Sequence, residues 1–309
     1  MDNEIMPLPV SVVLCTFNDE RTIKEAIESI LCQSYNNFEF IIWNDGSTDG
    51  TEEIIKSYKD NRIRYFFHEN TGLGEALRLA CAEAKGKYIA RMDGDDICLP
   101  NRIQKQVEFL ESHPDYVLVS SAVYYIDENG EQIGRSFPIT WDVNLRKALK
   151  YGSPIAHPAS MFTREAYLKA GGYLPLYSAQ DRVLWSKMKD CGKFKNLSTP
   201  LIKYRKGNIS IGAVLSGEEY WNVLEFFRRK IANQHIVDEE DIKIYNQICK
   251  HAKEKCKIGH NGKRRKQNTG LNNRLYNMFQ PILGEHFVIN TIILCKNIVC
   301  FFKNIRDGA

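Results

Sequence analysis

The sequence lacks the patterns that identify several common classes of protein. Its nine cysteines are scattered and never form a Cys-x-x-Cys pair, so we expect neither a disulfide framework nor a zinc module. No G-x-G-x-x-G follows the first apolar run and no G-x-x-x-x-G-K-[ST] occurs, which excludes the dinucleotide fingerprint and the P-loop. The first residues have no apolar stretch of the kind found in signal peptides. Reduced cysteines and this N-terminus together predict a cytoplasmic protein.

The sequence does contain enough apolar material for a folded core. Of its 309 residues, 43% are hydrophobic and 26% are charged, which is typical of soluble globular proteins. The 42 basic and 38 acidic residues give a net charge of +4, yet residues 251–309 alone carry 11 basic and 3 acidic side chains. The rest of the chain is therefore slightly acidic, and we expect the C-terminal part to meet any anionic surface.

The C-terminal part combines a basic cluster with an apolar segment. The segment Phe287–Ile305 is interrupted by asparagines and lysines, which makes it too polar to span a bilayer and favours a helix lying at a membrane surface. The basic cluster at 263–266 would attract anionic headgroups. No aromatic-interleaved basic groove accompanies it, so we expect no nucleic acid partner. We predict a membrane-associating tail at 259–309 that makes the protein peripheral on the cytosolic face. A helix that packs on the domain is the alternative.

Residues 10–206 alternate short apolar runs with segments of helical periodicity, which is typical of an α/β fold. The predicted strands are the apolar runs Val10–Cys15, Phe38–Trp43, Ile63–Phe67, Tyr88–Met92 and Tyr116–Tyr125. Helical spacing of apolar residues predicts helices from Ile23 to Leu31, at 48–58 and at 73–84. Such βαβ units predict a mostly parallel sheet with helices on both faces. We place this domain at 1–214 and further C-terminal helices at 215–258.

Polar side chains lie at the ends of three of the predicted strands. They are Thr16 and Asn18 after the first strand, Asp45 after the second, and Arg91 with the aspartates of residues 93–96 around the end of the fourth. Ligands of open α/β sheets bind beyond the carboxyl ends of the strands, so we expect these residues to face one crevice. Asn18 is also predicted to cap the helix that follows it.

Residues 93–96 read Asp-Gly-Asp-Asp and place three carboxylates at one strand end. Their mutual repulsion would raise their pKa values unless a cation neutralised it, and carboxylate oxygens are ligands that suit Mg²⁺ and Mn²⁺. We therefore predict that Asp93 and Asp95 bind Mn²⁺ or Mg²⁺. An Asp-rich turn that caps the next helix is an equally good interpretation of these residues alone. Asp45, in its Asp-Gly-Ser sequence, is open to a similar structural interpretation.

Several segments, taken together and in order, are similar to a known family. They read Ser-Val-Val-Leu-Cys-Thr-Phe-Asn at 11–18, Asn-Asp-Gly-Ser-Thr-Asp-Gly-Thr at 44–51, Arg-Met-Asp-Gly-Asp-Asp at 91–96, Ser-Ala-Gln-Asp-Arg-Val-Leu-Trp at 178–185 and Pro-Leu-Ile-Lys-Tyr-Arg at 200–205. Over about residues 9–206 the chain resembles the family-2 inverting glycosyltransferases of GT-A fold, of the bacterial surface-polysaccharide type. The resemblance implies a GT-A-like, Rossmann-like sheet.

The resemblance also implies roles for individual residues. Asp45 would contact the nucleotide base, Asp93 and Asp95 would form the D-x-D pair that serves ribose, diphosphate and metal, and Asp181 would be the general base. The residue-level alternative for Asp181 is a helix N-cap. The family usually has Glu where this chain has Gln180, and many relatives have a His shortly after position 205 that is missing here.

Four further side chains are open to two interpretations each. His157 lies in a segment that resembles the donor-sugar side of the family, although a buried turn histidine fits equally well. Arg91 either offsets donor phosphate charge or pairs with the acidic run, and for Arg102 we expect the structural pairing. We expect Trp185 to belong to the core rather than to a sugar platform.

The function implied is sugar transfer with inversion from a nucleotide-diphosphate sugar to a hydroxyl of a lipid-linked glycan. A UDP-sugar is the first candidate donor, and synthesis of a surface polysaccharide (capsule, O-antigen or exopolysaccharide) is the expected setting. One alternative is an enzyme that makes a polyprenyl-phosphate sugar, although such enzymes often bring spanning helices. The other alternative is a catalytically inactive relative that binds nucleotide sugars.

Overall fold

The computed structural model describes residues 9–149 and 153–206, together with positions 239, 242, 243 and 246. All of these belong to the first of the two compact units into which the chain divides, Met1–Ile258 and Gly259–Ala309. Apart from those four positions, the predicted helices at 215–258 and the predicted tail at 259–309 lie outside the described residues. The domain boundaries therefore stay predictions.

The strands form one nine-stranded sheet with the order β3-β2-β1-β4-β8-β6-β9-β5, and β7 pairs with β6 beside this path. Their bounds are β1 Val10–Thr16, β2 Phe38–Asn44, β3 Ile63–Phe67, β4 Tyr88–Asp93, β5 Ile97–Cys98, β6 Tyr116–Ile126, β7 Gln132–Arg135, β8 Met161–Thr163 and β9 Lys193–Arg205. The short strands β5, β7 and β8 run against the other six, as their antiparallel pairings show. The predicted α/β fold is confirmed, and the sheet is mixed because these three strands are antiparallel to the others.

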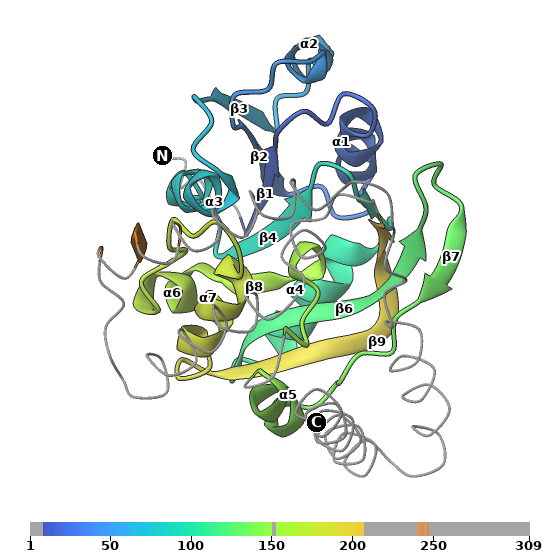
Figure 1. Cartoon of the computed structure of the whole chain (residues 1–309). Helices are drawn as coiled ribbons and strands as arrows, with labels where there is room; N and C mark the ends of the chain where they lie inside the picture. The colour runs from blue at the N-terminus through green and yellow to red at the C-terminus, as the bar shows by residue number, and fades with distance from the viewer. Residues whose placement is uncertain (1–8, 150–152, 207–238, 240–241, 244–245, 247–309) are drawn as a thin grey trace, which may run out of the picture. The chain divides into compact units, whose positions relative to one another are not determined.

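Helices cover both faces of this sheet, as predicted. One face packs against α1 Ile23–Leu31, α2 Thr51–Ser57 and α4 Arg102–Ser112, and the other against α3 Leu73–Ala82, α5 Asp142–Ala148, α6 Arg164–Lys169 and α7 Gln180–Met188. Figure 1 shows α3 and α1 on opposite sides of β1 and β2. Along β1 the side chains alternate, with Val12 and Leu14 in one core cluster and Val13 and Cys15 in the other.

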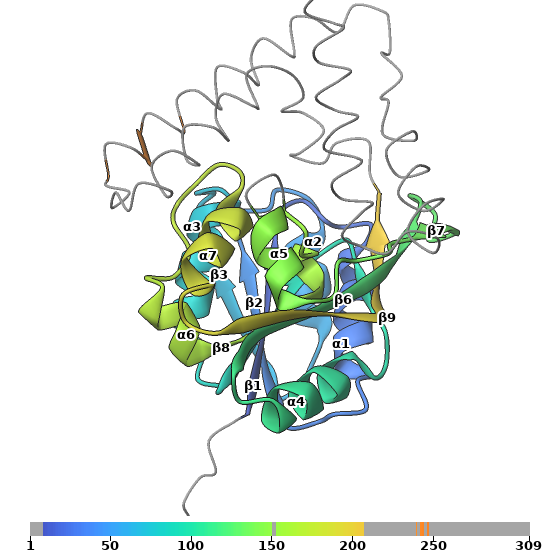
Figure 2. The same ribbon diagram turned by 90° about the horizontal axis from the view of Figure 1, so that it is seen from below.

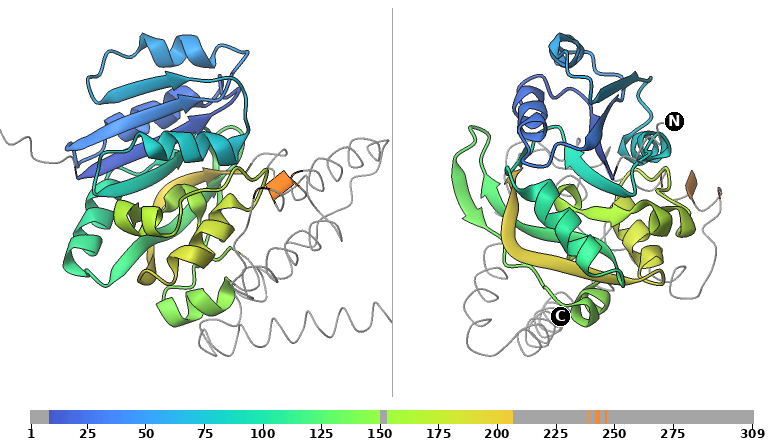
Figure 3. Two further views of the ribbon diagram at one scale, coloured as in Figure 1. Left: turned by 90° about the vertical axis from the view of Figure 1, so that its left-hand side faces the viewer. Right: turned by 180° about the vertical axis from the view of Figure 1, so that it is seen from behind.

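The central strands are predominantly apolar because both of their faces are covered. Every residue of β1 and β2 is buried, and burial of one aliphatic side chain contributes roughly 1.5–3 kcal/mol. The left view in Figure 3 shows the parallel strands β1 to β4, in blue and teal, running side by side. Figure 2 shows β6 along β9. The polar side chains at the carboxyl ends of β1, β2 and β4 belong to the site described below.

One negative finding bears on the membrane. Within the described ranges, no helix combines the length and the apolar character needed to cross a bilayer.

Candidate functional site

The carboxyl ends of β1, β2 and β4 meet at one edge of the sheet. These strands are parallel neighbours, and in register Thr16 pairs with Asn44 while Cys15 pairs with Asp93. The backbone N–H of Asp45 donates to the carbonyl oxygen of Thr16 at 2.9 Å. The polar residues predicted at the three strand ends are therefore brought together, with Thr16 between the other two strands.

Three carboxylates gather at the end of β4. Asp93, Asp95 and Asp96 each offer an oxygen, and these oxygens lie within 4.8 Å of one another. Asp96 is 1% exposed, and within the described part of the chain its Oδ2 atom has no hydrogen-bond partner. Burial and the charge of Asp93 raise the pKa of Asp95 to about 7 and that of Asp96 well above the usual value. Hard oxygen ligands with repelling charges and an orphaned buried oxygen fit a divalent cation such as Mg²⁺ or Mn²⁺.

Arg91 is a buried cation beside this cluster. Its side chain is 1% exposed and forms an ion pair with Asp93. Burial opposes its charge, but the carboxylate of Asp93 raises the pKa of Arg91 above the usual value, so it stays charged. Its Nε atom has no hydrogen-bond partner among the described residues. Arg91 is therefore a fixed, buried positive charge next to the acidic cluster.

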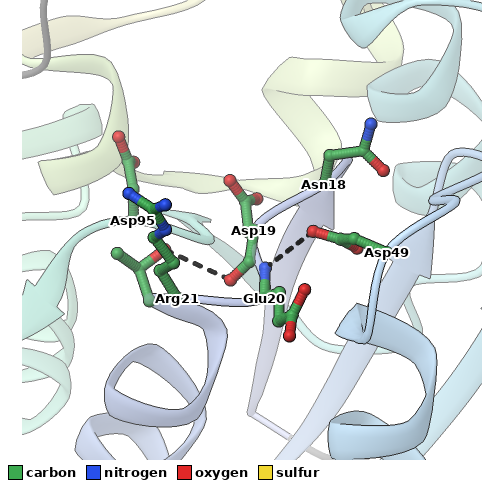
Figure 4. Close-up of a pocket in the computed structure, with 7 residues that line it drawn as sticks. Asn18, Asp19, Glu20, Arg21, Asp49 and Asp95 are labelled. Atoms are coloured by element: carbon green, nitrogen blue, oxygen red, sulfur yellow. Dashed lines mark hydrogen bonds between the residues drawn. The ribbon is translucent and has the colours of Figure 1, made fainter.

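Asp19 belongs to the same edge, although its sequence position was not singled out. Its Oδ2 atom accepts a hydrogen bond from Thr16 Oγ1 at 2.7 Å. Burial, followed by the charge of Asp93, raises its pKa to about 6 against the lowering effect of that hydrogen bond. Figure 4 shows Asp19 between Asp95 on one side and Asn18 and Asp49 on the other. These residues line a cavity of about 280 Å³. The sequence alone could have indicated Asp19, because it comes directly after Asn18 in the polar segment that follows the first strand.

The glycine between the two aspartates of the D-x-D pair has a steric reason. A Cβ atom on Gly94 would lie 2.4 Å from Asp19 Oδ2 and 3.1 Å from Thr16 Oγ1. Any side chain at position 94 would overlap the carboxylate of Asp19 in the position where it accepts the hydrogen bond from Thr16. Glycine therefore allows the loop after β1 to pack against the loop after β4.

Asp45 holds the loop that precedes α3. Its Oδ1 atom accepts from the backbone N–H and the hydroxyl of Thr71, both at 3.0 Å, and its Oδ2 atom accepts from the N–H of Gly72 at 2.9 Å. The side chain is 4% exposed. A carboxylate has about four lone-pair positions, so one position on Oδ2 is left for a ligand donor. The structural and the ligand-binding interpretations of Asp45 are therefore compatible.

Asn18 ties the loop after β1 to the loop after β2. Its N–H donates to Ser47 Oγ at 3.0 Å, and its Oδ1 atom accepts from the N–H of Thr48 at 2.8 Å. The prediction that Asn18 caps α1 is wrong, because the N-cap residue is Thr22. Asn18 instead adopts a φ of 57°, which turns the chain toward β2.

Gly46 gives a testable prediction about this loop pair. Its φ is +77°, and a Cβ atom there would lie 2.7 Å from the backbone nitrogen of Asn70. We expect Gly46→Ala to lower the free energy of unfolding by about 2–4 kcal/mol, because backbone strain and a clash with fixed backbone combine. Urea unfolding would measure this.

Gly171→Ala is the matched control, because its φ is +79° but nothing lies within 4 Å of the added Cβ. It should cost only about 1 kcal/mol. Equal losses in the two variants would show that the close approach to Asn70 has no energetic weight.

Asp181 lies in the first turn of α7, partly exposed, and accepts a hydrogen bond from Ser153 Oγ at 2.8 Å. Burial raises its pKa above the usual value, while the Ser153 hydrogen bond and the charge of Arg91 act in the opposite direction. The N-cap interpretation is wrong, because the cap position is Ala179. The charge of Arg91 acts on both Asp181 and Asp93.

The contacts of the remaining predicted residues favour structural roles for them. His157 Nε2 lies 2.7 Å from the hydroxyl of Tyr173, its ring packs edge-on against the fully buried Trp185, and burial lowers its pKa well below the usual value. Arg102 is fully buried and donates to the carbonyl oxygens of Arg91 at 2.6 Å and Ser160 at 3.1 Å. The prediction that Arg102 pairs with the acidic side chains is wrong, since it supports the backbone beneath them. Gln180 is buried beside Asp181.

Comparisons with known proteins identify the family and agree with the fold. Residues 11–172, more than half of the chain, match the family described as Glycosyl transferase family 2. The chain is 34% identical over 208 residues to the O-antigen biosynthesis glycosyltransferase WbnJ of Escherichia coli, covering 65% of this chain and 81% of WbnJ. It is 27% identical over 228 residues to the amylovoran biosynthesis glycosyltransferase AmsE of Erwinia amylovora, covering 72% of this chain and 85% of AmsE.

A solved structure confirms the GT-A-like fold. A crystal structure of S. aureus TarS 1–349 in complex with UDP-GlcNAc superposes with a TM-score of 0.62 at 18% identity, covering 88% of this chain and 81% of that one.

Proposed function

Since this chain belongs to glycosyl transferase family 2, we propose that it transfers a sugar, with inversion, from a nucleotide-diphosphate sugar to a hydroxyl of a lipid-linked glycan. The observation that carries the proposal is that Asp45, Asp93, Asp95 and Arg91 come together where the parallel strands β1, β2 and β4 end. A UDP-sugar is the proposed donor, and the complex of the structurally similar TarS with UDP-GlcNAc supports it.

Donor binding would use the three strand ends in turn. The free lone pair of Asp45 can accept an N–H from the nucleotide base. Thr16 accepts a hydrogen bond from the backbone N–H of Asp45, and Asn18 lines the cavity that Asp95 also borders. Asp93 and Asp95, with Asp96 beside them, would hold Mn²⁺ or Mg²⁺. When bound, such an ion neutralises charge on the departing diphosphate. The buried charge of Arg91, beside Asp93, would offset negative charge of the diphosphate without contacting it.

Asp181 is the proposed general base. The acceptor oxygen forms a bond to the anomeric carbon as its proton passes to Asp181, and the bond from that carbon to the diphosphate oxygen breaks with its electron pair. Attack opposite the leaving group inverts the anomeric centre. The hydrogen bond from Ser153 fixes the orientation of the carboxylate, and its partial burial makes it a stronger base than an exposed aspartate.

This role predicts how the transfer rate depends on pH. A base must be ionised, and burial raises the pKa of Asp181 above the usual 3.8. At saturating metal and donor, kcat should therefore decline about tenfold per pH unit below a midpoint that lies above 3.8. Circular dichroism at each pH provides the control for acid unfolding. If the enzyme stays folded and its kcat does not change as the pH falls to 3.8, Asp181 is not the general base.

The setting of the reaction is proposed from the relatives. WbnJ and AmsE are named for O-antigen and amylovoran biosynthesis, which supports synthesis of a surface polysaccharide on a lipid-linked acceptor. The basic tail at 259–309 would hold the enzyme on the anionic cytosolic surface of the membrane. Removal of residues 260–309 should release the protein from membrane fractions, and a truncated form that still sediments with them would contradict this anchoring.

One experiment tests donor class and metal need together. Thermal unfolding is measured with a panel of nucleotide sugars, each with Mn²⁺, with Mg²⁺ and with EDTA. We expect a UDP-sugar to raise the melting temperature only when a divalent ion is present. Turnover of that donor separates an enzyme from an inactive binding protein, and transfer to polyprenyl phosphate in place of a glycan would favour the alternative acceptor.

A further inference from the structure

One arginine at the end of β9 connects three parts of the site region. Arg205 is 8% exposed. Its Nε atom donates to the carbonyl oxygen of Asp95 at 2.8 Å, and its Nη1 atom donates to the carbonyl oxygens of Asp127 at 3.1 Å and Glu128 at 3.0 Å. Its Nη2 atom pairs with Glu25 at 2.7 Å. A single side chain therefore joins the acidic loop after β4, residues 94–96, to the turn between β6 and β7 and to α1.

The acidic loop depends on such a contact because it is short and fixed mainly at its ends. β4 pairs with β1 up to Asp93, and β5 begins at Ile97, which pairs with Lys203 of β9. Between these ends, the N–H of Arg205 donates to Asp96 Oδ1 at 2.8 Å, while its side chain fixes the carbonyl of Asp95. Arg205 thus sets the orientation of the peptide that joins two of the three clustered aspartates.

The guanidinium of Arg205 contacts none of the three clustered carboxylates, and its backbone N–H binds only Asp96 Oδ1. The guanidinium donates to three backbone carbonyls, and its charge is paired with Glu25, which lies outside the cluster. An arginine that paired with Asp95 or Asp96 directly would compete with a cation for their oxygens. Planar bidentate geometry makes arginine suited to hold several carbonyls at once, which lysine cannot reproduce.

We propose that Arg205 is a positioning residue for the divalent cation, and that it sets the affinity of the acidic cluster for that ion. This inference rests on the metal site of the proposed function. Residues that orient metal ligands typically change metal affinity about 10–100-fold when they are substituted. The same is expected here, because loss of the Arg205 side chain frees the Asp95 carbonyl and allows the three carboxylates to move apart.

The test measures Mn²⁺ binding to the full chain without donor, by electron paramagnetic resonance of free Mn²⁺. We expect the Kd to rise at least about 10-fold in Arg205→Ala and by a smaller factor in Arg205→Lys. Arg146→Ala is the matched control, because Arg146 also donates to two carbonyls and a carboxylate, those of Lys189, Gly192 and Asp142, at 2.6–2.8 Å. It should lower the melting temperature while leaving the Mn²⁺ Kd within about twofold of wild type.

The outcomes separate this inference from the function it rests on. Failure of wild type to bind Mn²⁺ would overturn the proposed metal site itself. Equal Kd values in wild type and Arg205→Ala would overturn only the positioning role, and if that variant does not fold, an unchanged Kd in Arg205→Lys would do the same. A weakened Kd in Arg146→Ala as large as that in Arg205→Ala would also overturn it, since general destabilisation would then explain both. At saturating Mn²⁺, Arg205→Lys should regain the wild-type kcat.

Discussion

Asp181→Asn should lower kcat by about 10²–10⁴-fold while leaving donor affinity near the wild-type value. The amide has the shape of the carboxylate and can still accept the hydrogen bond from Ser153 Oγ, so the local structure should persist. It cannot take a proton from the acceptor hydroxyl. Single-turnover rates with saturating donor and acceptor would measure the loss, and calorimetric titration of donor would test the unchanged affinity.

The matched control for this substitution is Asp115→Asn. Asp115 forms an exposed ion pair with Lys193 at 2.7 Å and precedes the N-terminal end of β6, at the sheet edge opposite to the site. Its replacement should leave kcat unchanged. A kcat above one tenth of wild type in Asp181→Asn, or an equal loss of donor affinity and of turnover, would show that Asp181 is not the base.

Asp95→Asn should abolish the effect of Mn²⁺ on thermal stability and lower kcat/KM by at least about 10²-fold, because it removes a charged oxygen ligand. It should also make the metal-free protein more stable at pH 8. Since burial and Asp93 raise the pKa of Asp95 to about 7, the stability linked to this group is complete below pH 4 and is lost as the pH rises through 7. The neutral amide avoids that loss.

Asp49→Asn is the contrasting control at the wall of the same cavity. Burial acts to raise its pKa, but hydrogen bonds from Thr51 and from the N–H of Glu20 lower it below the usual value. Its charged form therefore stabilises the fold above pH 4, and Asp49→Asn should lower the melting temperature at pH 8. Differential scanning calorimetry at pH 4 and pH 8, with and without Mn²⁺, distinguishes the two variants. Unchanged Mn²⁺ stabilisation in Asp95→Asn would contradict its role as a ligand.

The part of the fold that could be predicted from sequence is the part determined locally. β1, β2 and β4 are buried on both faces, so each is predominantly apolar, and α1 has its buried side chains at helical spacing. Because parallel strands share a carboxyl edge, the clustering of Thr16, Asp45 and Asp93 followed from the strand assignment.

The features that escaped prediction depend on contacts distant in sequence. β8 enters the sheet antiparallel between β4 and β6, and no local pattern in its three residues indicates this. The partners of Arg205 are up to 180 residues away, and those of Arg102 include the backbone carbonyls of Arg91 and Ser160, which carry no side-chain signature. Asn18 was predicted as a cap from its residue type, but its hydrogen bonds go to the loop after β2.

The central claim is that the acidic strand ends form one donor site in which a divalent ion joins carboxylates to a diphosphate. Calorimetric titration of UDP in the presence of Mn²⁺ and in EDTA tests it most directly. We predict that Mn²⁺ tightens UDP binding by at least about tenfold and, by linkage, that UDP tightens Mn²⁺ binding by the same factor. Equal UDP affinity with and without the ion would contradict the claim.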